Sequence, residues 1–191
     1  MPRIGIFGGS FNPIHIGHIA LARELLNNTE LDEIWFVVSP CNPLKNRNDL
    51  LEDSKRLEMV NIALQGEERM KASDFEFHLP KPSYMLHTLQ NLTKDYPSNT
   101  FILLVGADNW QLFDKWMGYK EIINNYDIII YPRQNIMIDA DKLPSSVRLV
   151  NTPLFNISST LIREKIKSGC SIHGLVPMKI ENKVIKYYLN R

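Results

Sequence analysis

The chain has 191 residues and a mass of 22.1 kDa, which predicts one domain, or one domain with a small appendage. Its 22 basic and 21 acidic side chains leave a formal net charge of +1, which excludes a bulk field able to hold a nucleic acid or an anionic membrane. No apolar run approaches the length of a membrane span. Because the two cysteines lack CxxC spacing and the N-terminus lacks the pattern of a signal peptide, we expect a cytoplasmic protein.

Short β-rich runs alternate with amphipathic helical patterns along the first half of the chain. Ile4 and Ile6 are β-branched residues in a run that ends at two glycines, which predicts a strand. Leu57, Val60 and Leu64 are spaced by three and four residues, which predicts a helix. In chain order we expect a strand at 3–7, a helix at about 16–27, a strand at 33–38, a helix at 51–64, a weak strand at 70–73 and a helix at 84–96.

The second half contains the most apolar strand, at 101–105, which is typical of a central parallel strand covered on both faces. Further strands are expected at 127–131 and 147–150, and helices at about 159–168 and 177–189. This alternation predicts an α/β fold with a doubly wound, mostly parallel sheet, whose ligands bind beyond the carboxyl ends of the strands. We expect one domain over residues 1–191, with a helical part from about 157 packed on a Rossmann-like core.

The turn between the first strand and the first helix has a composition that suits phosphate binding. Gly8 and Gly9 let main-chain N–H groups approach an anion, and the positive end of the following helix attracts phosphate. His15 and His18 share a face of the first helical turn, so both imidazoles can donate hydrogen bonds to phosphate oxygens, while Gly17 leaves room for a base or phosphate. Either histidine alone would more simply cap or pack locally, but the pair favours phosphate binding.

Two other readings of this turn are less favoured. The HxxH spacing lacks the glutamate of HExxH and a convincing third ligand, which argues against zinc. The glycines do not form GxGxxG, and no strong acidic ribose ligand is evident, which argues against a dinucleotide oxidoreductase.

A second anion site is expected near residue 160, at the start of a helix. Ser158, Ser159 and Thr160 place three hydroxyls on its first turn, and Arg163 follows one turn later. Taken alone, one of these hydroxyls is an N-cap and the arginine a solvated charge. Together with the first turn they predict that one polyphosphate is held from two sides.

The loops between these segments supply further candidates. Gly106 and Asp108 follow the most apolar strand and should open onto the same cleft, where Asp108 accepts protons from ribose hydroxyls or caps a helix. Trp116 and Tyr119 offer flat surface for a heteroaromatic ring, and we expect Trp116 in the pocket.

A further site for a small anion is expected at the start of the central helix, with cations in two other loops. Near Tyr84, free N–H groups could hold a small carboxylate, and Lys45 and Arg133 supply cations from other loops. Each of these basic residues taken singly is a surface charge.

Four segments carry a resemblance to a known family: GGSFNPIHIGH at 8–18, PSY at 82–84, GADN at 106–109 and ISSTLIR at 157–163. They resemble the HxGH nucleotidyltransferase superfamily, and specifically the bacterial nicotinate-nucleotide adenylyltransferases, over nearly the whole chain. The resemblance implies a Rossmann-like nucleotidyltransferase fold and the transfer of AMP from ATP to nicotinate mononucleotide in NAD biosynthesis. Such a transfer needs no protein nucleophile, and Mg²⁺ should arrive with ATP.

The resemblance also assigns roles to residues. His15 and His18 would be the catalytic pair at the ATP phosphates. The implied ATP site comprises Gly8, Gly9, Ser10, Phe11, Gly17, Gly106, Asp108, Arg133, Ser158, Ser159, Thr160 and Arg163. The implied mononucleotide site comprises Lys45, Tyr84, Met85, Trp116 and Tyr119. The family commonly has Asp where Asn12 stands, and Thr and Asp where Met85 and His87 stand.

Two alternatives remain open from the sequence. One is a related transferase that acts on nicotinamide mononucleotide or on phosphopantetheine, although the phosphopantetheine family usually has TxGH and a shorter chain. The other is a sensor that binds ATP without turnover, for which Asn12 is the hint. We expect no nucleic-acid or membrane partner and no metal held by the protein, and the sequence makes no prediction of oligomeric state.

Overall fold

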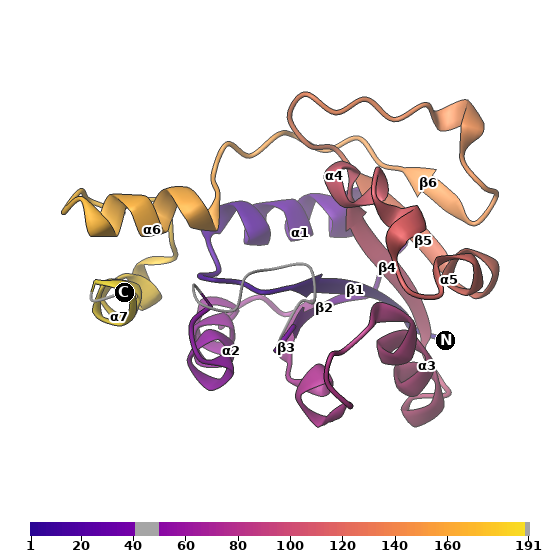
Figure 1. Ribbon diagram of the computed structural model, residues 1–191, viewed down its shortest axis with the longest axis horizontal. Helices are drawn as coiled ribbons and strands as arrows, with labels where there is room; N and C mark the ends of the chain where they lie inside the picture. Colours follow the sequence, from indigo (N-terminus) through magenta and orange to yellow (C-terminus); the bar gives the residue numbers. More distant parts are fainter. Residues whose placement is uncertain (41–49, 190–191) are drawn as a thin grey trace.

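A computed structural model describes residues 1–40 and 50–189, and within this part the chain forms a six-stranded, all-parallel sheet (Figure 1). The strands are β1 (Arg3–Gly9), β2 (Glu33–Val38), β3 (Met70–Ser73), β4 (Thr100–Gly106), β5 (Asp127–Tyr131) and β6 (Val147–Leu149). Their order in the sheet is β3-β2-β1-β4-β5-β6. The expected doubly wound α/β fold is therefore confirmed, and its strand order reverses between β1 and β4.

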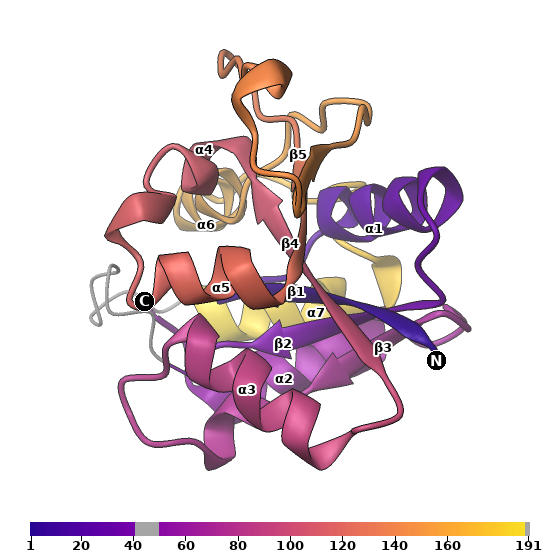
Figure 2. The same cartoon turned by 90° about the vertical axis from the view of Figure 1, so that its right-hand side faces the viewer.

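Helices cover both faces of the sheet, and each face buries an apolar cluster. They are α1 (Ile16–Asn28), α2 (Asp53–Ala63), α3 (Met85–Asp95), α4 (Ala107–Trp110), α5 (Tyr119–Asn125), α6 (Ser159–Lys167) and α7 (Met178–Tyr188). Side chains of α1, α2, α6 and α7 share one cluster, and side chains of α3 and α5 belong to the other. Figure 2 looks onto the face covered by α3 and α5. The sheet is thus buried on both sides, as its apolar central strands require.

The observed elements differ from the expected ones in three ways. β1 continues through Gly8 and Gly9 instead of ending before them, because these glycines stay in register with Val37 and Val38 of β2. Strands and helices also do not alternate strictly. Residues 132–146 join β5 to β6, and the helical structure among them is one short 3₁₀ turn, η4 (Ala140–Lys142). The sequence patterns missed α4, α5 and the 3₁₀ turns η2 (Phe75–His78) and η3 (Phe113–Lys115), all of which are short.

The end of the chain returns to the carboxyl end of β1, where α6 and α7 lie together near the start of α1 (Figure 1). Glu58 of α2 accepts hydrogen bonds from Lys183 Nζ at 2.7 Å and Tyr187 Oη at 2.8 Å, which joins α7 to the core. Tyr188 Oη also donates to Asn12 Oδ1 at 2.6 Å. The last helix therefore supports the turn that follows β1. In the described part of the chain, none of the helices combines the length and apolar character that a membrane span needs.

Candidate active site

The turn between β1 and α1 is tightly packed around its glycines. A Cβ on Gly9 would lie 2.9 Å from Cζ of Phe11, so the aromatic ring occupies the space that a side chain at position 9 would need. The Phe11 ring is buried and packs edge-on against Phe7, with ring centroids 5.7 Å apart. Phe11 therefore belongs to the core, and what the turn presents to a ligand at this position is main chain.

His15 and His18 lie together at the start of α1. Their rings stack with centroids 3.6 Å apart. The main-chain N–H of His15 donates to Nδ1 of His18 at 3.2 Å. Because that nitrogen accepts, a neutral His18 must carry its proton on Nε2. The hydrogen bond thus fixes the tautomer in which His18 can donate from Nε2.

His15 is the more buried of the two, with 5% of its surface exposed. Burial, and then the positive charge of Arg133, lowers the pKa of His15 to about 3, so this imidazole is neutral at physiological pH. Its Nδ1 has no hydrogen-bond partner among residues 1–40 and 50–189, which is unusual for a buried polar atom. A Cβ on Gly17 would lie 3.1 Å from that Nδ1, so the room left by Gly17 is taken by the His15 ring.

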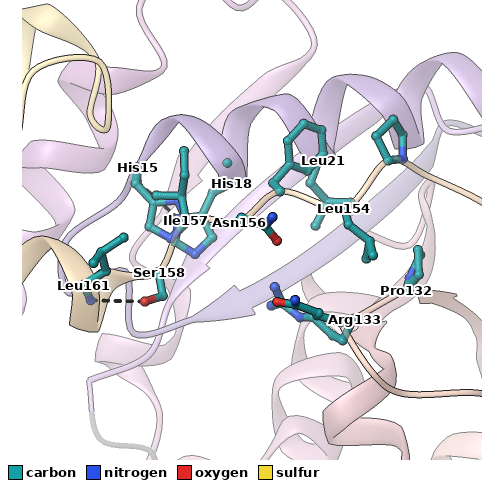
Figure 3. Close-up of a pocket in the computed structure, with 14 residues that line it drawn as sticks. His15, His18, Leu21, Pro132, Arg133, Leu154, Asn156, Ile157, Ser158 and Leu161 are labelled. Atoms are coloured by element: carbon teal, nitrogen blue, oxygen red, sulfur yellow. Dashed lines mark hydrogen bonds between the residues drawn. The ribbon is translucent and has the colours of Figure 1, made fainter.

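These histidines line a pocket of about 320 Å³ (Figure 3). Three segments form it: the start of α1, the residues that follow β5, and the segment that leads into α6. Figure 3 shows His15 and His18 next to Ser158, with Arg133 and Asn156 approaching from another side. The lining residues are His15, Gly17, His18, Leu21, Pro132, Arg133, Gln134, Pro153, Leu154, Phe155, Asn156, Ile157, Ser158 and Leu161. The expected convergence of the two anion-binding segments is therefore present.

Direct hydrogen bonds join the start of α6 to the β1–α1 turn. Ser159 Oγ donates to the carbonyl of Pro13 at 2.8 Å, and Arg163 Nη1 donates to the carbonyl of Asn12 at 2.8 Å. Ser158 is the N-cap of α6, since its hydroxyl accepts from Leu161 N at 3.1 Å. Of the four polar residues expected to hold phosphate here, Ser158 lines the pocket, while Ser159 and Arg163 bond the main chain of the turn.

Thr160 and Arg163 are linked to each other one turn apart. Arg163 Nη2 donates to Thr160 Oγ1 at 3.3 Å, a contact at the exposed surface of α6. The guanidinium thus spans from the turn to the helix, and both residues lie next to the pocket rather than among the residues that line it.

Arg133 enters the pocket from the loop after β5, as a partner of Asp108. Arg133 Nε lies 3.4 Å from Asp108 Oδ1, and its guanidinium carbon lies 5.2 Å from the centre of the Tyr131 ring. A Cβ on Gly106 would lie 3.0 Å from Arg133 Nε, so the glycine allows this close approach. Gly106 and Asp108 are thus at the expected carboxyl end of β4, with Asp108 in the first turn of α4 facing the arginine.

Of the expected mononucleotide residues, Tyr84 and Met85 lie at the start of α3, outside the residues that line the pocket. Tyr84 is the N-cap of α3 without a side-chain cap, so the first N–H groups of this helix have no capping side chain. Met85 lies against the end of β1, since a Cβ on Gly8 would be 2.7 Å from Met85 Cε. Lys45 lies outside the described residues.

Trp116 and Tyr119 are half-buried and pack against the apolar cluster of α3 and α5. Trp116 also packs on Phe113, with ring centroids 5.0 Å apart. Neither residue is among those that line the pocket beside the histidines. The expectation that Trp116 contacts a heteroaromatic ring stays a prediction for the α3 side of the cleft.

Sequence reasoning missed several lining residues for an identifiable reason. Pro132 and Gln134 closely follow β5, and ligands of a parallel sheet bind beyond the carboxyl ends of its strands, so this signal could have identified them. Leu21 is three residues after His18, so helical spacing alone could have placed it on the same face. Leu154, Phe155 and Asn156 carry no motif of their own, so only the tertiary structure identifies them.

Asn12 has a packing role at this site. Its side chain is 6% exposed, and Oδ1 accepts from Leu51 N at 3.1 Å as well as from Tyr188 Oη. These contacts direct the amide oxygen toward the segment before α2 and toward α7. The presence of Asn at position 12, where the family commonly has Asp, therefore does not alter the lining of the pocket.

Comparisons with known proteins agree with this geometry. The model of the cytidylyltransferase-like family matches residues 6–165. A probable nicotinate-nucleotide adenylyltransferase of Bacteroides fragilis is 46% identical over 184 residues, which cover 96% of this chain and 92% of the relative. A protein of the same name from Cytophaga hutchinsonii is 41% identical over 98% of this chain and 99% of its own length.

Solved structures show the same fold. The nicotinic acid mononucleotide adenylyltransferase of Plasmodium falciparum, in complex with NaAD, superposes with a TM-score of 0.84 at 24% identity. The match covers 99% of this chain and 97% of the other. A putative nicotinate-nucleotide adenylyltransferase from Vibrio parahaemolyticus superposes with a TM-score of 0.72 at 21% identity.

Proposed function

This chain belongs to the cytidylyltransferase-like family and, within it, to the nicotinate-nucleotide adenylyltransferases; from that premise we propose how its cleft divides between two substrates. The chain transfers AMP from ATP to nicotinate mononucleotide, and nicotinate adenine dinucleotide and pyrophosphate are the products. ATP binds in the pocket between the β1–α1 turn and α6. The mononucleotide binds toward the start of α3, and the chain acts as one domain.

The convergence of His15, His18, Arg133 and Ser158 on one pocket carries this assignment. All four side chains can donate hydrogen bonds to phosphate oxygens, and Arg133 also carries a positive charge. They come from segments that are far apart in the sequence. The buried Nδ1 of His15, which lacks a partner in the described chain, is a polar atom that a ligand can satisfy.

The reaction is a displacement at the α-phosphorus of ATP. An oxygen of the mononucleotide phosphate forms a bond to the α-phosphorus, and the bond from that phosphorus to the bridging oxygen of the β-phosphate breaks. Pyrophosphate leaves with the bonding electron pair, so negative charge builds on the leaving group. The chain accelerates this step by holding both substrates in line and by neutralising the charge.

The two histidines contribute as hydrogen-bond donors. The bond to Nδ1 of His18 leaves Nε2–H as the donor of its neutral tautomer, and the low pKa of His15 keeps the His15 ring uncharged at neutral pH. Arg133 supplies the fixed positive charge nearby. We infer that the histidines bind phosphate oxygens more strongly as the transition state gains charge, because a preorganised donor costs no reorganisation at that moment.

Mg²⁺ fits this site as a companion of ATP. In the part of the chain that the structure describes, no group of three or more His, Cys, Asp or Glu side chains is placed to hold a metal ion, and Asp108 is engaged with Arg133. We therefore propose that ATP oxygens are the main ligands of Mg²⁺, which when bound neutralises phosphate charge.

The proposal is tested by pyrophosphate release from ATP and Mg²⁺ with a panel of acceptors. We expect rapid release with nicotinate mononucleotide and slower release with nicotinamide mononucleotide or phosphopantetheine. Faster release with either of the other acceptors would show that the chain is a related transferase with a different acceptor. Binding of ATP without any release would instead support a sensor and contradict the proposed function.

A further inference from the structure

A buried acidic residue, Glu76, lies behind the start of α3, in the short turn η2. Only 3% of its surface is exposed. Among residues 1–40 and 50–189, it forms no ion pair with a lysine, arginine or histidine. Its position needs a reason because buried carboxylates are costly.

Two hydroxyl groups bind this carboxylate. Ser83 Oγ donates to Oε2 at 2.8 Å, and Thr88 Oγ1 donates to Oε1 at 3.0 Å. Ser39, which follows β2, lies close enough to help lower the pKa of Glu76. Burial raises the pKa of Glu76, and these hydroxyl bonds oppose that rise.

The bonded residues enclose the start of α3 on both sides. Ser83 precedes the N-cap Tyr84, and Thr88 lies in the first turn of the helix, where it is fully buried. Thr88 N also bonds the carbonyl of Tyr84 at 3.1 Å, as the first turn of the helix requires. The Glu76 carboxylate therefore fixes the position of the main chain between Ser83 and Thr88.

Two contacts connect this segment to the end of β1. Ser39, which lies beside Glu76, donates its N–H to the carbonyl of Gly9 at 2.9 Å. Met85, the first residue of α3, lies against Gly8. An apolar side chain at position 76 would fill the same space but would leave the hydroxyls of Ser83 and Thr88 without this acceptor.

We propose that Glu76 is a positioning residue that sets the start of α3 relative to the β1–α1 turn, and thereby places the mononucleotide in line with the α-phosphorus of ATP. The inference rests on the proposed function, because it takes the start of α3 as the side of the mononucleotide. Glu76 does not touch a substrate and acts through Ser83 and Thr88. A positioning error of this kind costs binding and rate without removing any reacting group.

The test compares Glu76→Gln with the wild-type chain in steady-state kinetics. Glutamine keeps the size of the side chain but removes one acceptor oxygen and the charge. We expect KM for nicotinate mononucleotide to rise about tenfold and kcat to fall severalfold, while KM for ATP changes by less than about twofold. KM for ATP is preserved because Ser159 and Arg163 still bond the turn.

A second pair of variants covers the case in which Glu76→Gln does not fold. Thr88→Val removes one donor and should raise KM for the mononucleotide, whereas Thr88→Ser keeps the hydroxyl and should restore it. Thr93→Val is the matched control in the same helix, because Thr93 Oγ1 bonds the carbonyl of Leu89 away from Glu76. Glu58→Gln is the matched control for the loss of a hydrogen-bonded carboxylate, since Glu58 joins α2 to α7.

Hydrogen exchange supplies a readout that does not depend on turnover. We expect the amides of residues 83–88 to exchange faster in Glu76→Gln than in the wild-type chain, and to be unchanged in Glu58→Gln. A lower melting temperature with both KM values unchanged would mean that Glu76 only stabilises the fold, and would overturn the inference.

The outcomes separate this inference from the proposed function. A wild-type chain that releases no pyrophosphate with any acceptor overturns the proposed function and the inference with it. An active wild-type chain whose Thr88→Val and Thr88→Ser variants share one KM for the mononucleotide overturns the inference alone.

Discussion

The side of the site proposed for the phosphates (the phosphate side), built from the β1–α1 turn and the start of α6, is braced differently from the side proposed for the mononucleotide (the base side), at the start of α3. On the phosphate side, Ser159 and Arg163 bond the main-chain carbonyls of Pro13 and Asn12 directly. On the base side, the hydroxyls of Ser83 and Thr88 both depend on one carboxylate, that of Glu76.

The difference shows how much each side depends on single residues. Several independent bonds hold the phosphate side, so loss of one leaves the others in place. One acceptor serves the base side, so its loss releases two hydroxyls at once. We therefore expect substitutions on the phosphate side to affect the chemical step and ATP, and those on the base side to affect the mononucleotide.

The largest effect is expected for His15→Ala on the phosphate side. Because the variant removes a buried donor that lines the pocket, kcat should fall on the order of 100-fold or more, with little change in KM for the mononucleotide. Steady-state pyrophosphate release measures both. His173→Ala removes an exposed histidine elsewhere and should leave kcat unchanged. A His15→Ala variant with wild-type kcat would contradict the expectation that the phosphate side governs the chemical step.

The second prediction concerns acid stability. The pKa of His15 is about 3 in the folded chain and near 6.5 in the unfolded chain, so below about pH 6.5 the unfolded chain takes up a proton that the folded chain does not. Between about pH 7.5 and about pH 5, this group should therefore lower the free energy of unfolding by about 2 kcal/mol. The loss is complete only as the pH falls to about 3.

Urea unfolding of the wild-type chain and of His15→Asn across this range isolates that contribution. The stability difference between the two chains should shift by about 2 kcal/mol in favour of the variant at the acid end. A difference that stays constant with pH would show that His15 is not held neutral by burial.

A smaller effect is expected for Arg163→Ala, which removes the bond to the carbonyl of Asn12. KM for ATP should rise about tenfold, since a hydrogen bond from a charged group is lost at the pocket edge. Arg163→Lys should recover only part of this, because lysine cannot reproduce the planar fork of the guanidinium. Arg148→Ala in β6 controls for the loss of a positive charge. Equal KM values for Arg163→Ala and the wild-type chain would contradict the assigned bracing.

The smallest effect is expected for Met85→Thr on the base side, which introduces the residue common in the family. The Met85 side chain lies against Gly8, and the proposed contact of this segment with the pyridine group uses main-chain N–H groups. The ratio of kcat/KM for nicotinate and nicotinamide mononucleotides should therefore change by less than about threefold. A change above about tenfold would show that the side chain at position 85 selects the acceptor.

Local patterns in the sequence were sufficient for most of the fold. β-branched runs predicted the strands and spacing by three and four predicted the long helices, because these signals depend on neighbouring residues alone. The ends of elements were less predictable: β1 continues through Gly8 and Gly9 because pairing with β2, a tertiary contact, outweighs the local tendency of glycine to end a strand.

The sequence by itself determined the order of the strands and long helices. It also determined the turn that carries the two histidines, the helix start that carries the three hydroxyls, and the family that both resemble. Motifs and periodicity depend on residues that are close together in the sequence, so they can be recognised without the tertiary structure. The tertiary structure decided that Ser159 and Arg163 bond carbonyls about 150 residues away, that His15 is buried and neutral, and that Glu76 accepts hydrogen bonds from the hydroxyls of Ser83 and Thr88. Hydrogen-bond partners and burial depend on which segments meet in space, and that meeting is set by the packing of the whole sheet.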